Sequence, residues 1–313
     1  MNVTPPPHYS SLASALAALY GRSVAVARSE RVSGGDINRA YALTLTDGRR
    51  IFMKANAKQN AAFFTAEAAG LSAIAATGAV GTPEVLCTGT DDGEGGGCSF
   101  LLLNYIASVK RRADYWEVFA RELAAMHNAD TAAFVSMQTG EASPLRFGFF
   151  QDNFIGARPQ CNAPAASWIS FFRENRLVPQ FKAADSYFSA SDRALNTKLL
   201  DHLEDFLVEP EKPSLLHGDL WGGNVLCNEE GKAILIDPAV YVGHAEADLA
   251  MTELFGGFPR AFYTAYREAR PLQAGYERRR DLYNLYQLLN HLNLFGPQYL
   301  GAVNSVVAEY VGR

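Results

Sequence analysis

Three side chains with carboxylate or amide oxygens lie in one stretch of the chain, residues 214–238. Asp219 follows a His-Gly pair, Asn224 comes five residues later, and Asp237 follows a short apolar run. A carboxylate can accept a hydroxyl proton, and a carboxylate and an amide oxygen together suit Mg²⁺. The His-Gly-Asp triplet alone would indicate only a turn. The ordered set predicts a phosphoryl-transfer site with Asp219 as base and Asn224 and Asp237 as metal ligands.

The segments around this set are expected to form a strand, a loop and a second strand. Residues 233–236 (AILI) have the pattern of a buried strand, and Leu215 and Leu216 form a short apolar lead-in. Between them, Gly218 and the pair that follows Trp221 allow tight backbone turns.

Lys54 and Glu67 are a candidate ion pair. In the expected strand 50–55 the side chains alternate between faces, so Lys54 shares a face with Phe52. Residues 59–77 have helical spacing, and Glu67 lies in their apolar stripe. A carboxylate on an inward face needs a cationic partner, because a buried unpaired charge is costly. Either side chain could instead extend to solvent. The ion pair is favoured because kinases use such a pair to orient phosphates.

Two glycines, Gly34 and Gly35, precede the expected strand 39–45. A loop of this kind can place backbone N–H groups over a phosphate. A lone Gly-Gly pair is weak evidence, and an ordinary loop is the alternative. We interpret the pair as a phosphate-covering loop on the strength of the other motifs.

Strands are expected to give way to helices near residue 106. The sequence therefore predicts a domain over 1–106 and a second over 107–313. The fold class is α+β: a two-lobed protein-kinase-like fold with a small antiparallel-sheet N-lobe carrying one key helix and a larger, mainly helical C-lobe. Strands are expected at 24–27, 39–45, 50–55, 85–89 and 98–106, and helices at 10–20, 59–77, 114–129, 168–177, 189–207, 246–255, 259–269, 276–295 and 299–311. His291, one step from the apolar face of its helix, is expected to be structural.

Bulk properties exclude several classes of function. The 313 residues are 48% hydrophobic, enough for a large core. The net charge is −5 and no long basic run occurs, which argues against nucleic-acid binding. The four cysteines show no metal-ligand spacing, the N-terminus has no signal-peptide pattern, and no apolar run reaches the length of a membrane span. A cytoplasmic protein that contacts no membrane is expected.

The sequence resembles the fructosamine/ketosamine-3-kinase family, within the small-molecule kinases that include aminoglycoside and choline kinases. The resemblance covers most of the chain beyond residue 33. HGDxxxxN indicates only the superfamily, whereas the tryptophan of HGDLW, DNFIGxxPQ and ELFGGF indicate the narrower family. The segments that carry it are SGGDINRAY (33–41), FMKAN (52–56), EAAGL (67–71), FGFFQDNFIGARPQCN (147–162), LLHGDLWGGNVL (215–226) and LIDPAVYVGHAEADLAMTELFGGF (235–258).

The resemblance implies a role for each matching residue. Asp219 would accept the proton of the sugar hydroxyl, while Asn224 and Asp237 would hold Mg²⁺. Lys54, oriented by Glu67, would contact the phosphates of ATP.

Further roles follow from the same resemblance. Gly34 and Gly35 would belong to the covering loop, and Asn104, Tyr105 and Ile106 would form the hinge that binds adenine through backbone groups. His217 and Asp248 would support the catalytic loop, and Trp221 points to a sugar-amine acceptor.

The implied substrate is a ketosamine, the adduct of a sugar and an amine, free or on a protein lysine. Phosphorylation of its 3-hydroxyl would destabilise the adduct and release the amine. Two alternatives stay open: another small-molecule kinase of the aminoglycoside or choline type, and a nucleotide-binding scaffold without activity. The complete set of candidate residues argues against the scaffold. The preferred sugar and amine and the oligomeric state are not indicated.

Two positions depart from the family pattern, and one pair departs from that of protein kinases. Asp36 stands where many members have cysteine, and Asn104 stands where an acidic residue is common. Pro238 and Ala239 follow Asp237 instead of the Phe-Gly of protein kinases, so no activation switch of that kind is implied.

Overall fold

The computed structural model describes residues 4–32, 38–93, 97–135 and 146–312, which form two compact units. The first unit comprises Met1–Tyr115 and Val225–Pro238; the second comprises Trp116–Asn224 and Ala239–Arg313. The sequence predicts a boundary after residue 106 and assigns all later residues to the second domain. In the structure, the segment Val225–Pro238 returns to the first unit.

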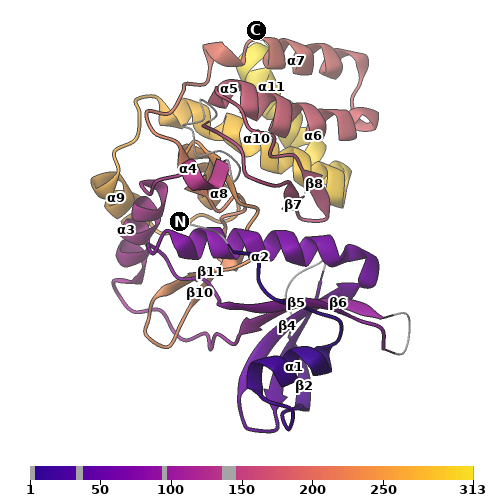
Figure 1. The fold of residues 1–313 in the computed structure, drawn as a ribbon. Coiled ribbons are helices and arrows are strands. Elements are labelled where there is room, and N and C mark those ends of the chain that lie inside the picture. The colour runs from indigo at the N-terminus through magenta and orange to yellow at the C-terminus, as the bar shows by residue number, and fades with distance from the viewer. Residues whose placement is uncertain (1–3, 33–37, 94–96, 136–145, 313) are drawn as a thin grey trace. The chain divides into compact units, whose positions relative to one another are not determined.

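The first unit is built on a mainly antiparallel sheet (Figure 1). Its six strands have the order β1-β5-β6-β4-β3-β2. Strand β1 pairs in parallel with β5, so the sheet is mixed. The predicted antiparallel pairing holds for all its other neighbours. The strands are β1 (His8–Tyr9), β2 (Val26–Val32), β3 (Arg39–Leu45), β4 (Arg50–Ala57), β5 (Val85–Asp91) and β6 (Cys98–Asn104).

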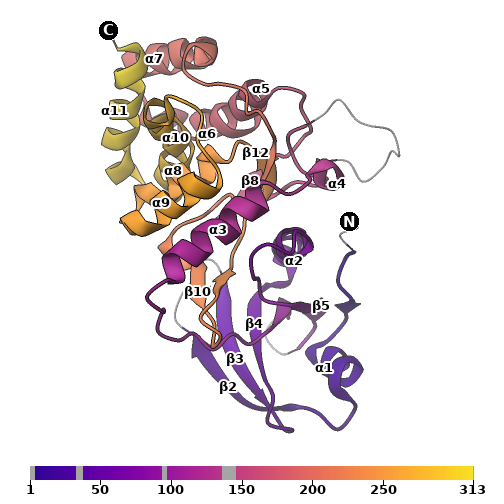
Figure 2. The same cartoon turned by 90° about the vertical axis from the view of Figure 1, so that its left-hand side faces the viewer.

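One helix covers each face of this sheet, because successive side chains of a strand point to opposite faces. Leu101 of β6 packs with Phe64 of the second helix, whereas Phe100 packs with Leu16 of the first. These helices are α1 (Leu12–Tyr20) and α2 (Ala61–Ala76) (Figures 1 and 2). The key helix of the prediction is α2.

A hairpin from the middle of the chain completes the first unit. Its strands, β10 (Val225–Cys227) and β11 (Ala233–Leu235), pair antiparallel. The N–H of Leu235 donates to the carbonyl of Gly81 at 2.8 Å, and the N–H of Val109 donates to that of Cys227 at 2.9 Å. These hydrogen bonds fix the hairpin, and with it the chain that leads to Asp237, to the first unit.

The second unit is mainly helical. Its longest helix, α10, is buried around most of its circumference and packs against α6, α8 and α11 (Figure 2). The helices are α3 (Tyr115–His127), α4 (Ala132–Val135), α5 (Trp168–Phe172), α6 (Val178–Ala183), α7 (Ala190–Asp201), α8 (Glu246–Leu254), α9 (Arg260–Ala269), α10 (Tyr276–Phe295) and α11 (Leu300–Val311). Tyr115, the first residue of α3, still belongs to the first unit. No helix within the described ranges is long and apolar enough to cross a membrane.

Two short strand pairs shape the second unit near the loop that carries Asp219. Strand β9 (Ser214–Leu216) pairs with β12 (Tyr241–Gly243), and β7 (Asn153–Ile155) pairs with β8 (Arg158–Gln160). The first pair places the chain before His217 beside the chain that follows Ala239.

Most predicted elements are present, and several differ in a physically simple way. Strand β3 and helix α10 have the predicted bounds. The strand predicted at 24–27 is wrong in extent: β2 runs to Val32, because it is an exposed edge strand that tolerates the charged residues Arg28, Glu30 and Arg31. The helix predicted at 168–177 changes to a π-helical turn, η2, at Arg173. Strands β7, β8 and β10 were not predicted, because three-residue strands carry almost no periodicity.

Candidate active site

Lys54 of β4 lies between two carboxylates of the first unit. Its Nζ donates to Oε1 of Glu67 on α2 at 2.5 Å and also to Oδ1 of Asp237. The ion pair of Lys54 with Glu67 expected from the sequence is therefore present. Burial by itself would lower the pKa of Lys54, but the two carboxylates outweigh burial and raise it. Lys54 is thus a firmly charged cation with its position fixed from two sides.

Asp237 has an unusual backbone conformation. Its φ is +55°, the only positive value among the described residues other than glycine. Pro238 follows it, and a residue before proline is itself restricted in conformation. A non-glycine residue in this region costs about 1–2 kcal/mol and commonly marks a functional site. The strained turn directs the Asp237 carboxylate to Lys54, at the point where the chain leaves the first unit.

In the second unit, Asp219 and Asn224 are linked within one loop. The amide nitrogen of Asn224 donates to the backbone carbonyl of Asp219 at 2.8 Å and to its Oδ2 at 3.2 Å. Asn224 ends a short 3₁₀ turn, Gly222–Asn224, whose glycines allow the tight path. The structure therefore brings together the predicted base and one predicted metal ligand.

Gly218 allows the close approach that shapes this loop. Its φ is +81°, and a Cβ at this position would lie 2.1 Å from the carbonyl oxygen of Ala239. The N–H of Ala239 donates to the carbonyl of His217 at 2.8 Å, and Gln287 of α10 donates to the carbonyl of Gly218 at 3.0 Å. The backbone before Asp219 is thus held from two directions.

Asp248 of α8 anchors the same backbone. Its Oδ2 accepts from the N–H of His217 at 2.7 Å and its Oδ1 from the N–H of Gly218 at 2.9 Å. Its Oδ2 also lies 3.2 Å from Nε2 of His127, whose Nδ1 lies 2.7 Å from the Tyr266 hydroxyl. Burial lowers the pKa of His127, so the ring is neutral. Since a carboxylate can only accept, Nε2–H donates to Asp248 and Nδ1 accepts from Tyr266.

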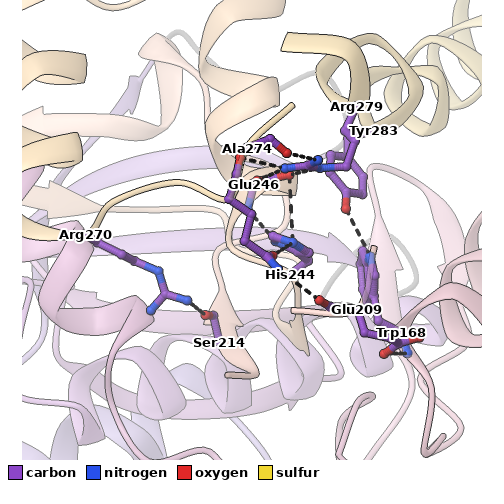
Figure 3. A network of polar contacts seen from close by, with 10 residues as sticks. Trp168, Glu209, Ser214, His244, Glu246, Arg270, Ala274, Arg279 and Tyr283 are labelled. Carbon is purple, nitrogen blue, oxygen red and sulfur yellow. Dashed lines mark hydrogen bonds and ion pairs between the residues drawn. The ribbon is translucent and has the colours of Figure 1, made fainter. Parts of the chain in front are cut away.

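A buried ion pair fixes the helix that presents Asp248 (Figure 3). Arg279 of α10 donates from Nε and Nη2 to the two oxygens of Glu246 at 2.7 and 2.6 Å. Its Nη1 also donates to the carbonyl of Ala274 at 2.8 Å. The bidentate geometry holds α8 in one orientation against α10. Asp248 lies two residues after Glu246, so this ion pair fixes the turn from which it projects.

His244 contacts the first residue of the same helix (Figure 3). Its Nδ1 accepts from the N–H of Glu246 at 3.2 Å, and its Nε2 lies 3.0 Å from Oε1 of Gln273. Burial lowers the pKa of His244 to about 3. The neutral ring can therefore accept at one nitrogen and donate at the other.

The predicted hinge residues lie at the end of β6. The Asn104 side chain accepts from the N–H of Glu84 at 2.6 Å. It therefore holds the segment that precedes β5 in place. The ring of Tyr105 lies under the guanidinium of Arg50, 3.8 Å from it. Ile106 follows, partly exposed. Gly34, Gly35 and Asp36 lie outside the described residues.

Trp221 is the exposed aromatic residue of the loop. The residue is 40% exposed, and its ring lies against Gly223, where a Cβ would come within 2.4 Å of it. His291, by contrast, lies on α10 with Nδ1 2.8 Å from the carbonyl of Gln287, and burial lowers its pKa.

The aromatic segment 147–177 contributes core and not surface in its main positions. Phe147, Phe149, Trp168, Phe171 and Phe172 are all buried, and Trp168 packs against several of them. These five rings are therefore not available to a ligand, whereas Phe150 and Phe154 of the same segment are half-buried.

Sequence reasoning missed the residues that support the loop from a distance. His127 lies within the helix predicted over 114–129 and has no role assigned from the sequence, and neither Glu246 nor Arg279 is given one. A charged residue at a buried position of an amphipathic helix, such as Arg279, was the available signal. Its partner could not be identified because the two are 33 residues apart.

The oxygen donors present fit a magnesium ion better than a transition metal. The described residues hold no group of three or more His, Cys, Asp and Glu side chains that could bind a metal. Magnesium in kinases instead needs few protein ligands, because phosphate oxygens and water complete its shell. The amide nitrogen of Asn224 is engaged with Asp219, so its Oδ1 is the atom left to act as a ligand.

Comparisons with known proteins agree along nearly the whole chain. The model of the fructosamine kinase family matches residues 8–313. A protein of Synechocystis described as a probable ketoamine kinase is 38% identical, over 96% of this chain and 95% of its own. The chloroplastic protein-ribulosamine 3-kinase of Arabidopsis thaliana is 37% identical, over 93% of this chain and 85% of its own.

Solved structures agree with this. A Haemophilus somnus protein described as a candidate fructosamine-3-kinase superposes with a TM-score of 0.81 at 28% identity, covering 96% of each chain. An amicoumacin kinase superposes with a TM-score of 0.57 at 13% identity, covering 91% of this chain and 88% of its own, which shows a shared kinase-like fold. The two-lobed α+β fold expected from the sequence is confirmed, and the chain belongs to the fructosamine kinase family.

Proposed function

We propose that this protein is an ATP- and Mg²⁺-dependent kinase that phosphorylates the 3-hydroxyl of ketosamines, fructosamine or ribulosamine adducts of amines or protein lysines. The observation that carries the proposal is the pairing of Lys54 with both Glu67 and Asp237 in a chain of this family. A buried lysine held by two carboxylates is suited to binding phosphate oxygens, because its charge and position do not depend on the ligand.

Each residue has a role in this proposal. Lys54, oriented by Glu67, binds ATP phosphates, and the backbone of Asn104, Tyr105 and Ile106 receives adenine. Gly34 and Gly35 cover the phosphates.

The remaining roles belong to the loop and the metal. Asp219 accepts the proton of the acceptor hydroxyl. Asn224 through Oδ1 and Asp237 hold Mg²⁺, which when bound neutralises charge on the phosphates. His217 and Asp248 keep the loop in place and do not react.

Trp221 supplies an exposed aromatic face close in sequence to the base. The ring is apolar on its face and polar only at Nε1. It is therefore suited to contact the carbon-bound hydrogens of a sugar while the hydroxyls remain solvated. Replacing Trp221 by alanine is expected to raise KM for the acceptor more than it lowers kcat.

The test is turnover on a panel of acceptors: a fructosamine, a ribulosamine, choline and an aminoglycoside. We expect ATP-dependent phosphorylation of one or both ketosamines. Phosphorylation of choline or the aminoglycoside alone would move the protein to the alternative class of small-molecule kinases, and no phosphorylation of any acceptor would refute a kinase.

A single substitution tests the base. Asp219→Asn keeps the size of the side chain and leaves unchanged the backbone carbonyl that Asn224 contacts. The amide of the new side chain cannot accept the proton. We expect turnover to be abolished and nucleotide binding to be retained. Equal loss of both would show that Asp219 is structural. Nucleotide binding is measured by calorimetry with ADP and Mg²⁺.

A further inference from the structure

Arg176 is a buried cation without a carboxylate partner. It lies in the π-helical turn η2 (Arg173–Leu177), its exposed fraction is 0%, and no ion pair to it occurs within the described part of the chain. π-Helical turns are rare and often occur at functional sites. Burying a guanidinium away from a carboxylate is costly, so its neighbours must compensate.

Backbone carbonyls, an amide and aromatic rings compensate this charge. Nη1 donates to the carbonyl of Cys161 at 2.6 Å and Nη2 to Oδ1 of Asn162 at 2.7 Å. The guanidinium also lies over Tyr241, 3.9 Å from the ring centre, and 4.7 Å from that of Phe171. Arg176 is thus fixed to the chain that follows β8.

From Asn162 a chain of buried amides continues. Its Nδ2 donates to Oδ1 of Asn153 at 3.0 Å, and Nε2 of Gln160 donates to the same oxygen at 2.8 Å. Gln160 also donates to the carbonyl of Ala239 at 3.1 Å, and Asn153 donates to that of Val240 at 2.7 Å. All three amide side chains are buried, where such hydrogen bonds are strong and their loss is costly.

The amides end on the backbone that supports the catalytic loop. Ala239 donates to the carbonyl of His217, and its own carbonyl oxygen lies where only glycine at position 218 leaves room. His217 and Gly218 immediately precede Asp219. All residues in this chain of contacts, from Arg176 to the loop, belong to the second unit.

We infer that Arg176 is a positioning residue for phosphoryl transfer, acting through Asn162, Asn153 and Gln160 on the loop that carries Asp219. This inference rests on the proposed function. Arg176 touches neither substrate nor nucleotide. Its loss lets Ala239 and the His217–Gly218 backbone shift, and a shift of about 1 Å in such a loop can cost about 100-fold in rate.

The test compares Arg176→Met with Arg173→Met. Arg173 lies in the same π-helical turn but is partly exposed, and among the described residues its side chain donates only to the carbonyl of Leu200 and to Glu204. We expect kcat to fall about 10- to 100-fold in Arg176→Met, with the Kd for Mg²⁺ and ADP unchanged, and to change less than about twofold in Arg173→Met. Arg176→Lys keeps the positive charge but lacks the two Nη groups that donate to Cys161 and Asn162. This variant should retain part of the wild-type kcat.

A second variant breaks the same chain elsewhere. Gln160→Met has a similar volume but donates to neither Ala239 nor Asn153. If both residues act through one chain of contacts, the double variant Arg176→Met with Gln160→Met loses less in log kcat than the two losses added together. Additive losses would refute a shared path. Gln160→Met also tests the inference by itself if Arg176→Met does not fold.

Hydrogen exchange of the peptide 214–224 gives a readout that does not need turnover. We expect faster exchange in Arg176→Met and Gln160→Met than in Arg173→Met. Unchanged exchange together with unchanged kcat in the folded variants would overturn the inference. If wild-type protein shows no kinase activity, the proposed function fails, while altered exchange would still establish that Arg176 holds the loop.

Discussion

Gly218 provides a sharp test of how the catalytic loop is held. In Gly218→Ala the new Cβ would lie 2.1 Å from the carbonyl oxygen of Ala239, about 0.9 Å inside the 3.0 Å that real contacts respect. The obstacle is backbone, so it cannot rotate away. The φ of +81° adds about 1–2 kcal/mol for an alanine, and overpacking adds about 1–3 kcal/mol. Together we expect a loss of about 2–5 kcal/mol in the free energy of unfolding.

Gly256→Ala is the matched control in the same unit. Its φ is +88°, but nothing lies within 4 Å of the Cβ position, so it should cost only the backbone term, about 1–2 kcal/mol. Urea unfolding measures both losses. If Gly218→Ala relaxes by moving the loop instead of unfolding, kcat should fall about 100-fold with nucleotide binding retained. A Gly218→Ala variant as stable as Gly256→Ala, with normal kcat, would refute the argument.

Three further predictions concern the metal ligand, the buried ion pair and pH. Asp237→Ala should raise the Kd for Mg²⁺ and ADP, measured by calorimetry, at least tenfold, because it removes a charged ligand and frees Lys54 from one carboxylate. An unchanged Kd would exclude Asp237 as a ligand. Arg279→Met leaves Glu246 buried and unpaired and should cost about 3–5 kcal/mol in urea unfolding, whereas an exposed control, Arg278→Met, should cost little. His244 has a lower pKa in the folded protein than in the unfolded chain, so the unfolded state binds the extra proton. The free energy of unfolding should therefore fall as the pH drops from about 6.5 toward 3, by up to about 1.4 kcal/mol per pH unit. His244→Gln should reduce this slope.

Much of the candidate site could be predicted because its residues lie in local patterns. Lys54 and Glu67 were paired correctly because a charge in an apolar helical stripe needs a partner on the adjacent strand. Asp219, Asn224 and Asp237 stand in a spacing that points to their chemistry, whatever the surrounding structure. The long regular elements were predictable for the same reason, as the bounds of α10 show.

Other features were not predictable because they depend on which surfaces meet. Asp237 contacts Lys54 across 183 residues of sequence, and His127 contacts Asp248 across 121. The return of Val225–Pro238 to the first unit follows from backbone hydrogen bonds of a hairpin too short to show a period. The burial of Arg176 likewise depends on the rings and carbonyls that surround it, and these come from distant segments.

The sequence by itself determined the fold class, the phosphoryl-transfer chemistry and the ion pair of Lys54 with Glu67, because residue types and their short-range spacing carry this information. Only the tertiary structure decided how the backbone before Asp219 is held: by Asp248, by Ala239 and by the amides that lead to Arg176. The physical reason is that a hydrogen bond forms between groups that are close in space, and packing of whole elements decides which groups those are.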